Sequence, residues 1–114
     1  MTVVDTREDS LGRLGQDWRG DFVLGHGMDS RVLERAGAEK ADAAVVATSG
    51  DNTNLVIGQV LQRRYEIPIV VVRVLDPARA EFYAARGLNT VCPTKTAIAA
   101  LVDALRAAVP AESA

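Results

Sequence analysis

The sequence has 114 residues, of which 48% are hydrophobic and 25% charged, and its formal net charge at pH 7 is −2. This size and balance fit one small globular domain with a single core, and the scattered Lys and Arg residues exclude the basic patch of a nucleic-acid-binding protein. Cys92 and His26 are the only cysteine and histidine, so the sequence predicts no disulfide framework and no metal centre, and it suits a reducing cytoplasm.

Short β-branched runs alternate with longer helical patterns along the whole chain. Strands are predicted at residues 2–5, 21–25, 43–48, 68–75 and 89–92. Helices are predicted at about 7–14, 30–36, 52–65, 77–86 and 95–108. The strand runs are continuously apolar, as strands covered on both faces of a parallel sheet require. The alternation therefore predicts a three-layer α/β/α fold with a mostly parallel sheet and right-handed crossovers.

Residues at the predicted helix ends support these boundaries. Asp29 or Ser30 is expected to cap the helix that follows it, and Gly37 to stop that helix in the left-handed conformation. Pro77 falls in the first turn of its helix, where a missing N–H costs little, and Thr94 precedes the last helix.

The last predicted helix has one apolar face, formed by Ile98, Leu101, Val102 and Leu105. A face of this kind favours packing against another chain. The tail at 110–114 is small and polar, which is typical of a frayed end or the beginning of a linker. The predicted organisation is one domain over residues 1–109 followed by this tail.

Asp5 is the first candidate for a functional residue. In doubly wound dinucleotide-binding folds, an acidic residue at the end of the second strand accepts hydrogen bonds from ribose hydroxyls, about twenty residues after a glycine-rich phosphate loop. These 114 residues contain no such loop. The alternative is that Asp5 only caps the following helix. Nearby Arg7 either neutralises a phosphate or lies in solvent.

The stretch "GHGMDS" follows a predicted strand and opens a helix, so its backbone donors could meet an anion. It supplies Gly25 and Gly27, but Ser30 stands where a third glycine would complete the fingerprint. The alternative is a tight turn that needs glycine at positive φ. His26 either stacks on or hydrogen-bonds to a base, or it is an exposed loop residue.

The stretch "ATSGDNTN" joins a predicted buried strand to the longest helix. Ligands of open α/β sheets bind beyond the carboxyl ends of the strands, where Thr48, Ser49 and the backbone around Gly50 offer donors. The alternative is a capping cluster, which would account for Asp51 or Asn52 but explains "TSG" less well.

Arg73 is a charge inside an otherwise apolar strand. Because an unpaired buried arginine is costly, we expect it to reach the strand end or to meet an anion such as Asp5, Asp51, Asp76 or a ligand phosphate. No nucleophile with an oriented base is visible in the sequence, so an enzyme is not expected.

Three stretches together resemble the RCK or TrkA-N (KTN) domain, the nucleotide-binding module of TrkA-type potassium transport regulators. They are "VVDTRED", "VLGHGMDSRVLERAGAEKADAAVVATSGDNTNL" and "PIVVVRVLDPARAEFYAARGLNTVCPT", and the resemblance runs from Val3 to about Leu105. It is most specific at "VLERAGAEKADA", "ATSGDNTN" and "VRVLDP". It implies a Rossmann-like fold that lacks its first strand, phosphate loop and helix.

The resemblance also implies roles for individual residues. Asp5 matches the acidic residue that holds the adenosine ribose, with Thr6 and Arg7 on the same rim. Gly25 to Gly27 match the turn beside the adenine ring. The family usually carries Gly-Asp there, so His26 is a departure.

Two further positions follow from the same resemblance. Thr48 and Ser49 match the strand end that faces the nucleotide, and Arg73 matches a strand arginine near the ligand or a subunit interface. The expected ligand is NAD(H) or ATP/ADP, which biases a conformational change and is not transformed.

In the usual strand order the missing first strand is central. We therefore expect the strands beginning near Thr2 and Ala43 either to pair directly or to leave a gap that another chain fills; a truncated sequence is a third possibility. Nucleotide affinity is expected to be much reduced or absent, since most anion-binding donors belong to the absent loop.

The expected function is that of a regulatory nucleotide-binding subunit of a potassium uptake or channel system. The expected partners are a membrane transporter or channel subunit and further copies of the chain, as a dimer or tetramer. The longest apolar run, "IPIVVVRVL", is too short to span a bilayer, so at a membrane another subunit would have to do the spanning. The resemblance implies a cytoplasmic location at the inner face of the cell membrane, through that partner. The alternatives are a fragment of an NAD-dependent oxidoreductase and an assembly module that binds no nucleotide.

Overall fold

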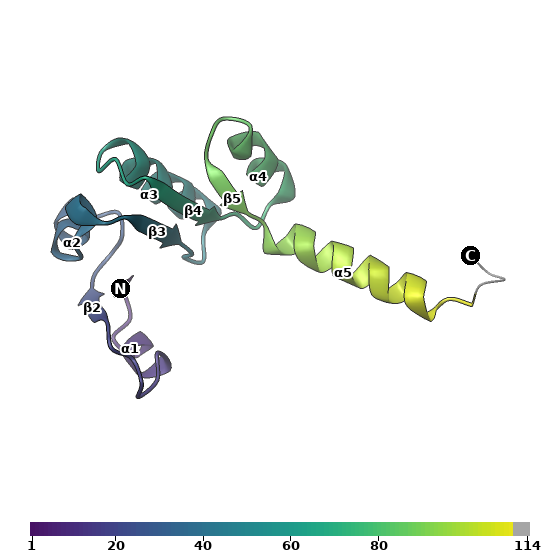
Figure 1. Ribbon diagram of the computed structural model, residues 1–114, viewed down its shortest axis with the longest axis horizontal. Coiled ribbons are helices and arrows are strands. Elements are labelled where there is room, and N and C mark those ends of the chain that lie inside the picture. The colour runs from purple at the N-terminus through teal and green to yellow at the C-terminus, as the bar shows by residue number, and fades with distance from the viewer. Residues whose placement is uncertain (111–114) are drawn as a thin grey trace.

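A computed structural model describes residues 1–110 of the chain. Strands and helices alternate as the sequence predicts (Figure 1): β1 (Thr2–Asp5), α1 (Ser10–Arg13), β2 (Asp21–Leu24), α2 (Ser30–Arg35), β3 (Ala43–Val46), α3 (Asp51–Arg63), β4 (Ile69–Arg73), α4 (Pro77–Ala84), β5 (Asn89–Val91) and α5 (Pro93–Ala108). A short 3₁₀ helix at Ala38–Lys40 follows α2. Helix α1 is shorter than predicted, because Gly12 lies within it and Gly15 turns the chain at a φ of 87°.

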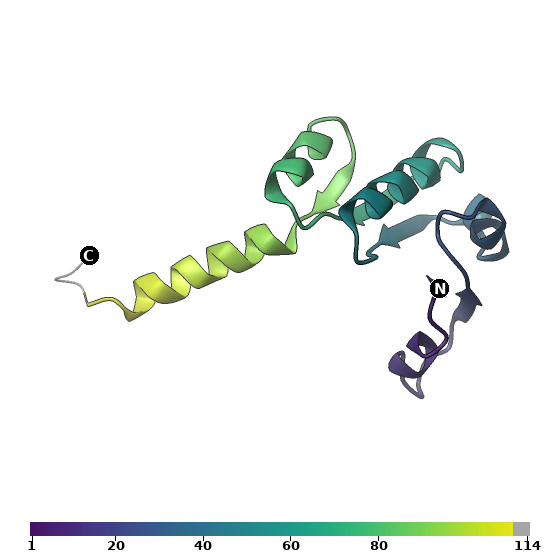
Figure 2. The ribbon, with the colours of Figure 1, turned by 180° about the vertical axis from the view of Figure 1, so that it is seen from behind.

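The strands form two separate parallel sheets, one of order β1-β2 and one of order β3-β4-β5. In the first, Val3 lies opposite Phe22, and in the second, Val45 lies opposite Val71. Within residues 1–110, β1 pairs only with β2 and β3 only with β4. The expectation that the strands beginning near Thr2 and Ala43 pair directly is therefore wrong. Figures 1 and 2 show the β1-α1-β2 unit standing apart from the larger sheet.

The main core lies between the β3-β4-β5 sheet and the helices α3 and α4. Val72 and Val74 are fully buried there, at 0% exposure. Helix α3 comes close to β4 at Gly58, where an added Cβ atom would lie 2.5 Å from Cγ2 of Val72. On the neighbouring strand the hydroxyl of Thr90 donates to the carbonyl of Ala80 in α4 (3.1 Å). Both helices therefore cover the same face of the sheet.

The opposite face of the β3-β4-β5 sheet is apolar and open. Val45, Ile69 and Val91 point to it and are exposed by 76%, 57% and 50%. Successive residues of a strand point to opposite faces, so the continuous apolar runs that predicted burial on both sides give one buried face and this open one.

The N-terminal unit of β1, α1 and β2 has no core of its own, because no residue between 1 and 31 is buried. Each of its strands has four residues. An isolated two-stranded sheet of this length is marginally stable at best in water. This unit therefore depends on further contacts for its order.

Helix caps agree with most of the predicted boundaries. Asp29 accepts a hydrogen bond from the Arg31 N–H (2.9 Å), and Gly37 follows α2 at a φ of 93°. The expected start of the last helix after Thr94 is wrong: Cys92 is its N-cap residue, and its Sγ atom accepts from the Lys95 N–H (3.5 Å). Pro93 causes this shift, since proline suits the first helical position.

Helix α5 extends away from the rest of the molecule (Figure 1) and contains no buried residue. Ile98, Leu101 and Leu105 on its apolar face are exposed by 52%, 70% and 66%. Of the tail predicted at 110–114, residues 111–114 lie outside the described part of the chain. Within the described part, no helix has the length and apolar character needed to cross a membrane.

Gly58→Ala tests the close approach of α3 to β4. The new methyl group would meet Val72, so the free energy of unfolding should fall by about 1–3 kcal/mol, although alanine is the better helix former by about 1 kcal/mol. Gly12→Ala is the matched control, because an added Cβ atom there meets nothing within 4 Å. The measurement is urea unfolding followed by circular dichroism. Equal stability of the two variants would contradict the close packing of α3 on β4.

Candidate functional site

Asn54, in the first half of α3, connects the carboxyl ends of β3 and β4. It is 1% exposed, and its amide oxygen accepts from the Thr48 N–H (2.8 Å). Its amide nitrogen donates to the carbonyls of Thr48 (3.1 Å) and Arg73 (3.0 Å). The sequence analysis did not single out Asn54. The available signal was its spacing with Gly58 and Leu61, which places it on the buried face of α3.

Asp51 joins the start of α3 to the segment after β4. Its carboxylate accepts hydrogen bonds from the backbone N–H groups of Leu75 (2.8 Å) and Asp76 (3.0 Å). These two hydrogen bonds lower the pKa of Asp51 below its ordinary value of 3.8. The alternative that Asp51 or Asn52 caps the helix is wrong, since the N-cap residue is Gly50 and no side chain caps this end.

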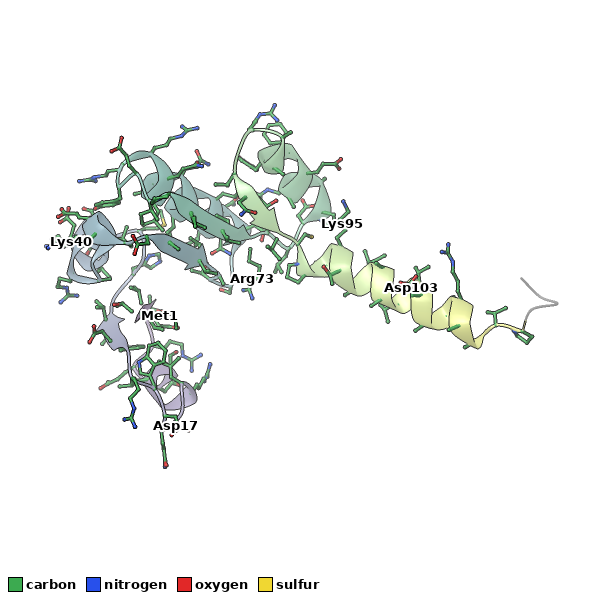
Figure 3. The ribbon with its side chains drawn as sticks, in the orientation of Figure 1. Met1, Asp17, Lys40, Arg73, Lys95 and Asp103 are labelled. Atoms are coloured by element: carbon green, nitrogen blue, oxygen red, sulfur yellow. The ribbon has the colours of Figure 1, made fainter. Side chains whose placement is uncertain are left out.

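Arg73 stands at the end of β4 (Figure 3) and reaches across to the end of β3. Its guanidinium donates to the carbonyls of Ala47 (3.3 Å) and Thr48 (2.7 Å). Arg73 was expected either to reach the strand end or to meet an anion, and the structure shows the first of these. Its Nε atom is buried with no hydrogen-bond partner among residues 1–110.

The backbone groups of Thr48 are occupied by Asn54 and Arg73, which fixes the start of the loop after β3. Ser49 is exposed next to it. Of the donors predicted in this loop, the Ser49 side chain is thus the more accessible to a ligand.

Asp5 lies at the carboxyl end of β1, half-buried. One carboxylate oxygen accepts from the Arg7 N–H (2.9 Å), a hydrogen bond that lowers the pKa of Asp5. Its backbone carbonyl accepts from the Gly25 N–H (2.9 Å), so the strand end and the glycine turn lie side by side. Thr6 follows Asp5 on the exposed side of the turn, and the Arg7 side chain pairs with Asp9 (3.1 Å) at the surface.

The turn from Gly25 to Gly27 is shaped by packing and not by positive φ, because neither glycine has that conformation. An added Cβ atom at Gly25 would lie 2.5 Å from Val32, and one at Gly27 would lie 2.9 Å from Ile57. The predicted alternative of a positive-φ turn is therefore wrong. Between the glycines, Nδ1 of His26 accepts from the Met28 N–H (3.1 Å).

The predicted site residues thus form two groups. Asp5, Thr6, Arg7 and the Gly25–His26–Gly27 turn gather at the end of the β1-β2 sheet, and Thr48, Ser49 and Arg73 gather at the end of the β3-β4 pair. A cavity of about 130 Å³ between α2 and α3 includes Gly27 but no other member of either group. Because the two sheets are not paired, the structure does not join the groups into one pocket.

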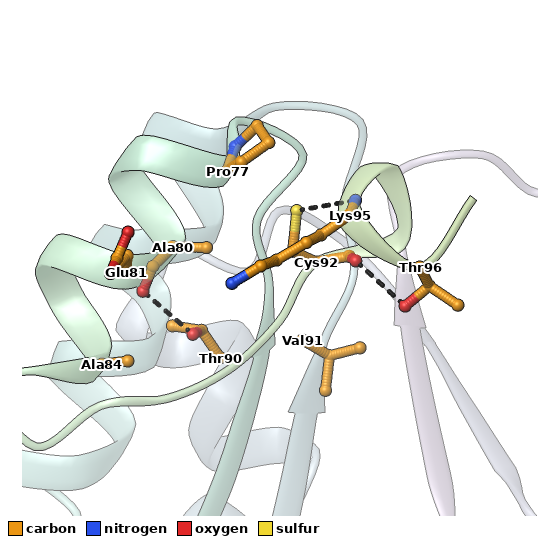
Figure 4. A pocket seen from close by; sticks show the side chains of 9 residues that line it. All are labelled: Pro77, Ala80, Glu81, Ala84, Thr90, Val91, Cys92, Lys95 and Thr96. Carbon is orange, nitrogen blue, oxygen red and sulfur yellow. Dashed lines mark hydrogen bonds between the residues drawn. The ribbon is translucent and has the colours of Figure 1, made fainter. Parts of the chain in front are cut away.

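A larger groove lies elsewhere, between α4, β5 and the first turn of α5 (Figure 4). It has a volume of about 500 Å³, and its lining includes Glu81, Cys92 and Lys95 but none of the predicted site residues. Cys92 and Thr90 are both engaged in hydrogen bonds that hold the surrounding elements. The groove therefore lies at the point where α5 extends away from the domain, between the elements that these hydrogen bonds hold.

The family model of the TrkA-N domain matches residues 1–94. The chain belongs to the TrkA-N domain family. This match confirms the resemblance to the TrkA-N domain that the sequence analysis predicts.

Relatives of this TrkA-N domain include two potassium uptake proteins. The chain is 36% identical over 95 residues to the Trk system potassium uptake protein TrkA of Streptomyces coelicolor, covering 83% of this chain and 43% of the relative. It is 30% identical over 98 residues to a TrkA homolog of Methanothermobacter thermautotrophicus, covering 85% of this chain and 45% of the relative. The chain therefore spans less than half the length of these relatives.

A solved structure has a similar fold. The NAD(P)-binding domain of an exopolyphosphatase-related protein from Archaeoglobus fulgidus superposes with a TM-score of 0.65 at 22% identity, covering 92% of this chain and 78% of that chain. The predicted Rossmann-like α/β fold is confirmed by this likeness, which at such low identity concerns the fold alone.

Asn54→Ala tests the buried amide that connects β3, β4 and α3. It removes the partners that Asn54 gives to the Thr48 N–H and the Arg73 carbonyl, both in part-buried hydrogen bonds, at up to about 1–3 kcal/mol each, so the midpoint of chemical unfolding should fall clearly. Asn52→Ala is the control, because Asn52 is an exposed asparagine of the same helix and its side chain accepts a hydrogen bond only at the surface, from Arg79. Equal losses for the two variants would show that Asn54 does not hold the strand ends together.

The lowered pKa of Asp51 predicts a pH-dependent contribution to stability. A carboxyl with a depressed pKa in the folded state stabilises the fold above its unfolded value and loses this effect as the pH falls through the folded value. Asp51→Asn should therefore destabilise the domain at pH 7, and the effect should fade as the pH falls below 3.8, the ordinary pKa of the carboxyl, and through its lower value in the folded state. Asp103→Asn on the exposed α5 is the control. A destabilisation by Asp51→Asn that is independent of pH would contradict the assignment.

Proposed function

We propose that this TrkA-N domain binds an adenine nucleotide at the carboxyl ends of its strands and belongs to the regulatory part of a potassium uptake system. The observation that carries the proposal is the position of Asp5 at the end of β1, hydrogen-bonded through its backbone to the Gly25 turn. An acidic residue at this place in a dinucleotide-binding fold accepts hydrogen bonds from ribose hydroxyls.

The lowered pKa of Asp5 supports this role, because it keeps the carboxylate ionised and able to accept from two hydroxyls. Arg7 is held by Asp9 in an exposed ion pair. Such pairs are worth roughly 0–1 kcal/mol, so Arg7 can leave Asp9 for a ligand phosphate at little cost. Thr6 would line the same rim.

The turn from Gly25 to Gly27 would lie beside the adenine ring. Packing against Val32 and Ile57 holds its backbone close to α2 and α3. His26 is held by the Met28 N–H through Nδ1, which leaves the imidazole face free to stack on a base.

The second group of residues would contact the rest of the nucleotide. Ser49 offers an exposed hydroxyl, whereas Thr48 and Arg73 act through their mutual hydrogen bond by fixing the strand end. The ligand would be NAD(H) or ATP/ADP, bound without chemical change, as in a sensor whose conformation follows its occupancy.

The names of the relatives support the potassium part of the proposal. Both the Streptomyces and the Methanothermobacter proteins are named for Trk system potassium uptake. We infer that this chain acts with a membrane subunit of such a system, from the cytoplasmic side and as an oligomer. The exposed apolar face of α5, which includes Leu101 and Leu105, is a surface for contact between copies.

The proposal is tested by calorimetric titration of the chain with ATP, ADP, NAD and NADH at matched salt. One ligand should bind with clear preference, and Asp5→Ala should abolish its binding, because the ribose would lose its acceptor. Asp17→Ala is the matched control, since Asp17 is an exposed aspartate of the loop before β2, away from the strand ends.

Each contrary outcome has a definite meaning. Equal affinity in wild type and Asp5→Ala would remove Asp5 from the site. No heat with any nucleotide, from a chain shown to be folded, would replace the proposal with an assembly module. Steady turnover of NADH would favour the oxidoreductase alternative.

A further inference from the structure

The imidazole of His26 is held at one of its two ring nitrogens. Nδ1 accepts a hydrogen bond from the Met28 N–H (3.1 Å). A ring nitrogen that accepts a hydrogen bond carries no proton, so the proton of the neutral imidazole lies on Nε2. Because His26 is exposed, its Nε2–H group is available to a ligand as a hydrogen-bond donor.

Acceptors in the same segment are already engaged. The backbone carbonyl of His26 accepts from the Asp29 N–H (3.0 Å). The carboxylate of Asp29 accepts from the Arg31 N–H (2.9 Å), and the carbonyl of Leu24 accepts from the Arg35 guanidinium (3.4 Å). The end of β2 therefore presents a free donor, while these acceptors serve the protein itself.

A nucleotide held at Asp5 would bring its base to this donor. The Gly25 N–H donates to the carbonyl of Asp5 (2.9 Å), so the turn that carries His26 adjoins the ribose acceptor. The ribose joins the base on one side to the phosphates on the other. With the phosphates directed toward Ser49, at the end of β3, the base lies at the end of β2.

Purine bases differ at position 6 in a way that a single donor can read. Adenine carries an amino group there, which is a donor, whereas guanine and hypoxanthine carry a carbonyl. Along this edge a 6-oxopurine offers two adjacent acceptors, O6 and N7, and adenine offers only N7. Stacking on the imidazole face accepts every base, because each has a π-face. Neither contact of His26 therefore selects adenine.

We propose that His26 is a specificity-determining residue for the base, and that the site takes 6-oxopurine nucleotides at least as tightly as adenine nucleotides. A site specific for adenine needs an acceptor opposite the 6-amino group, and His26 supplies a donor in this place. The proposal rests on the nucleotide binding proposed above and widens its ligand from adenine nucleotides to purine nucleotides.

The position of the ring proton is tested without any nucleotide, by NMR of the imidazole nitrogens. His26 is the only histidine of the chain, so one set of ring signals is expected. At about pH 8, which favours the neutral imidazole, the proton should be found on Nε2. A proton on Nδ1 would overturn the proposal, because the free nitrogen would then be an acceptor.

The choice of base is tested by calorimetric titration of the chain with ATP and ITP at matched salt. The base of ITP is hypoxanthine, which has a carbonyl in place of the 6-amino group. ITP should bind the wild-type chain at least as tightly as ATP, because the Nε2–H group of His26 meets an acceptor.

His26→Asp should reverse this preference. One oxygen of the new carboxylate can accept from the Met28 N–H, as Asp29 accepts from the Arg31 N–H, and the other is left for the 6-amino group. ATP should then bind at least about tenfold more tightly than ITP, a difference of about 1.4 kcal/mol.

Gln16→Asp is the matched control, since it adds the same charge at an exposed position of the loop before β2. It should leave the ratio of the two affinities as it is in the wild type. The ratio is the quantity compared, because an added negative charge weakens the binding of both triphosphates alike.

Two titration results would overturn this proposal alone. One is a preference of the wild-type chain for ATP over ITP, and the other is the same affinity ratio in the wild type and in His26→Asp. Absence of binding by both nucleotides, with a chain shown to be folded, would instead overturn the proposed nucleotide function and the role of His26 with it.

Discussion

A parallel strand needs a partner on each edge and cover on each face, and within the described residues only β4 has partners on both edges. The packing follows from this constraint. Val72 and Val74, in and just after β4, are fully buried on the face that α3 and α4 cover, whereas Ile69 of the same strand is exposed by 57% on the open face. Residues 1–31 contribute nothing buried. The domain is therefore organised about β4, with its N-terminal unit attached at one side.

The same asymmetry divides the candidate site. At the ends of β3 and β4, the buried amide of Asn54, the guanidinium of Arg73 and the carboxylate of Asp51 bind backbone groups, so the loops there are fixed before any ligand arrives. At the end of β1, the side chains of Asp5 and His26 accept hydrogen bonds from the backbone N–H groups two positions further along the chain, so these side chains are held by local contacts. A ligand that bridges the two groups would have to order this second half, and the cost of ordering would lower its affinity.

Local sequence patterns predicted the elements well, because each strand run is short, β-branched and bounded by glycine, proline or aspartate. Gly37 and Asp29 act as their residue types indicate. Long-range contacts were not predictable from local spacing. Asn54 is a polar residue on an apolar helix face, and Asp51 binds backbone N–H groups beyond β4 instead of capping its own helix. The glycines at 25 and 27 are required because Val32 and Ile57 leave no space for a Cβ atom. The absence of pairing between β1 and β3 also depends on the whole sheet and not on either strand alone.

The most direct test of this account is amide hydrogen exchange of the chain alone, followed residue by residue by NMR. Amides of β4 should exchange most slowly, because this strand is paired on both edges and covered by helices on one face. Those of β1 and β2, and the amides of β3 that point away from β4, should exchange much faster. Equal protection of β1, β3 and β4 would contradict the account, since it would show one continuous sheet in which the open edges do not exist.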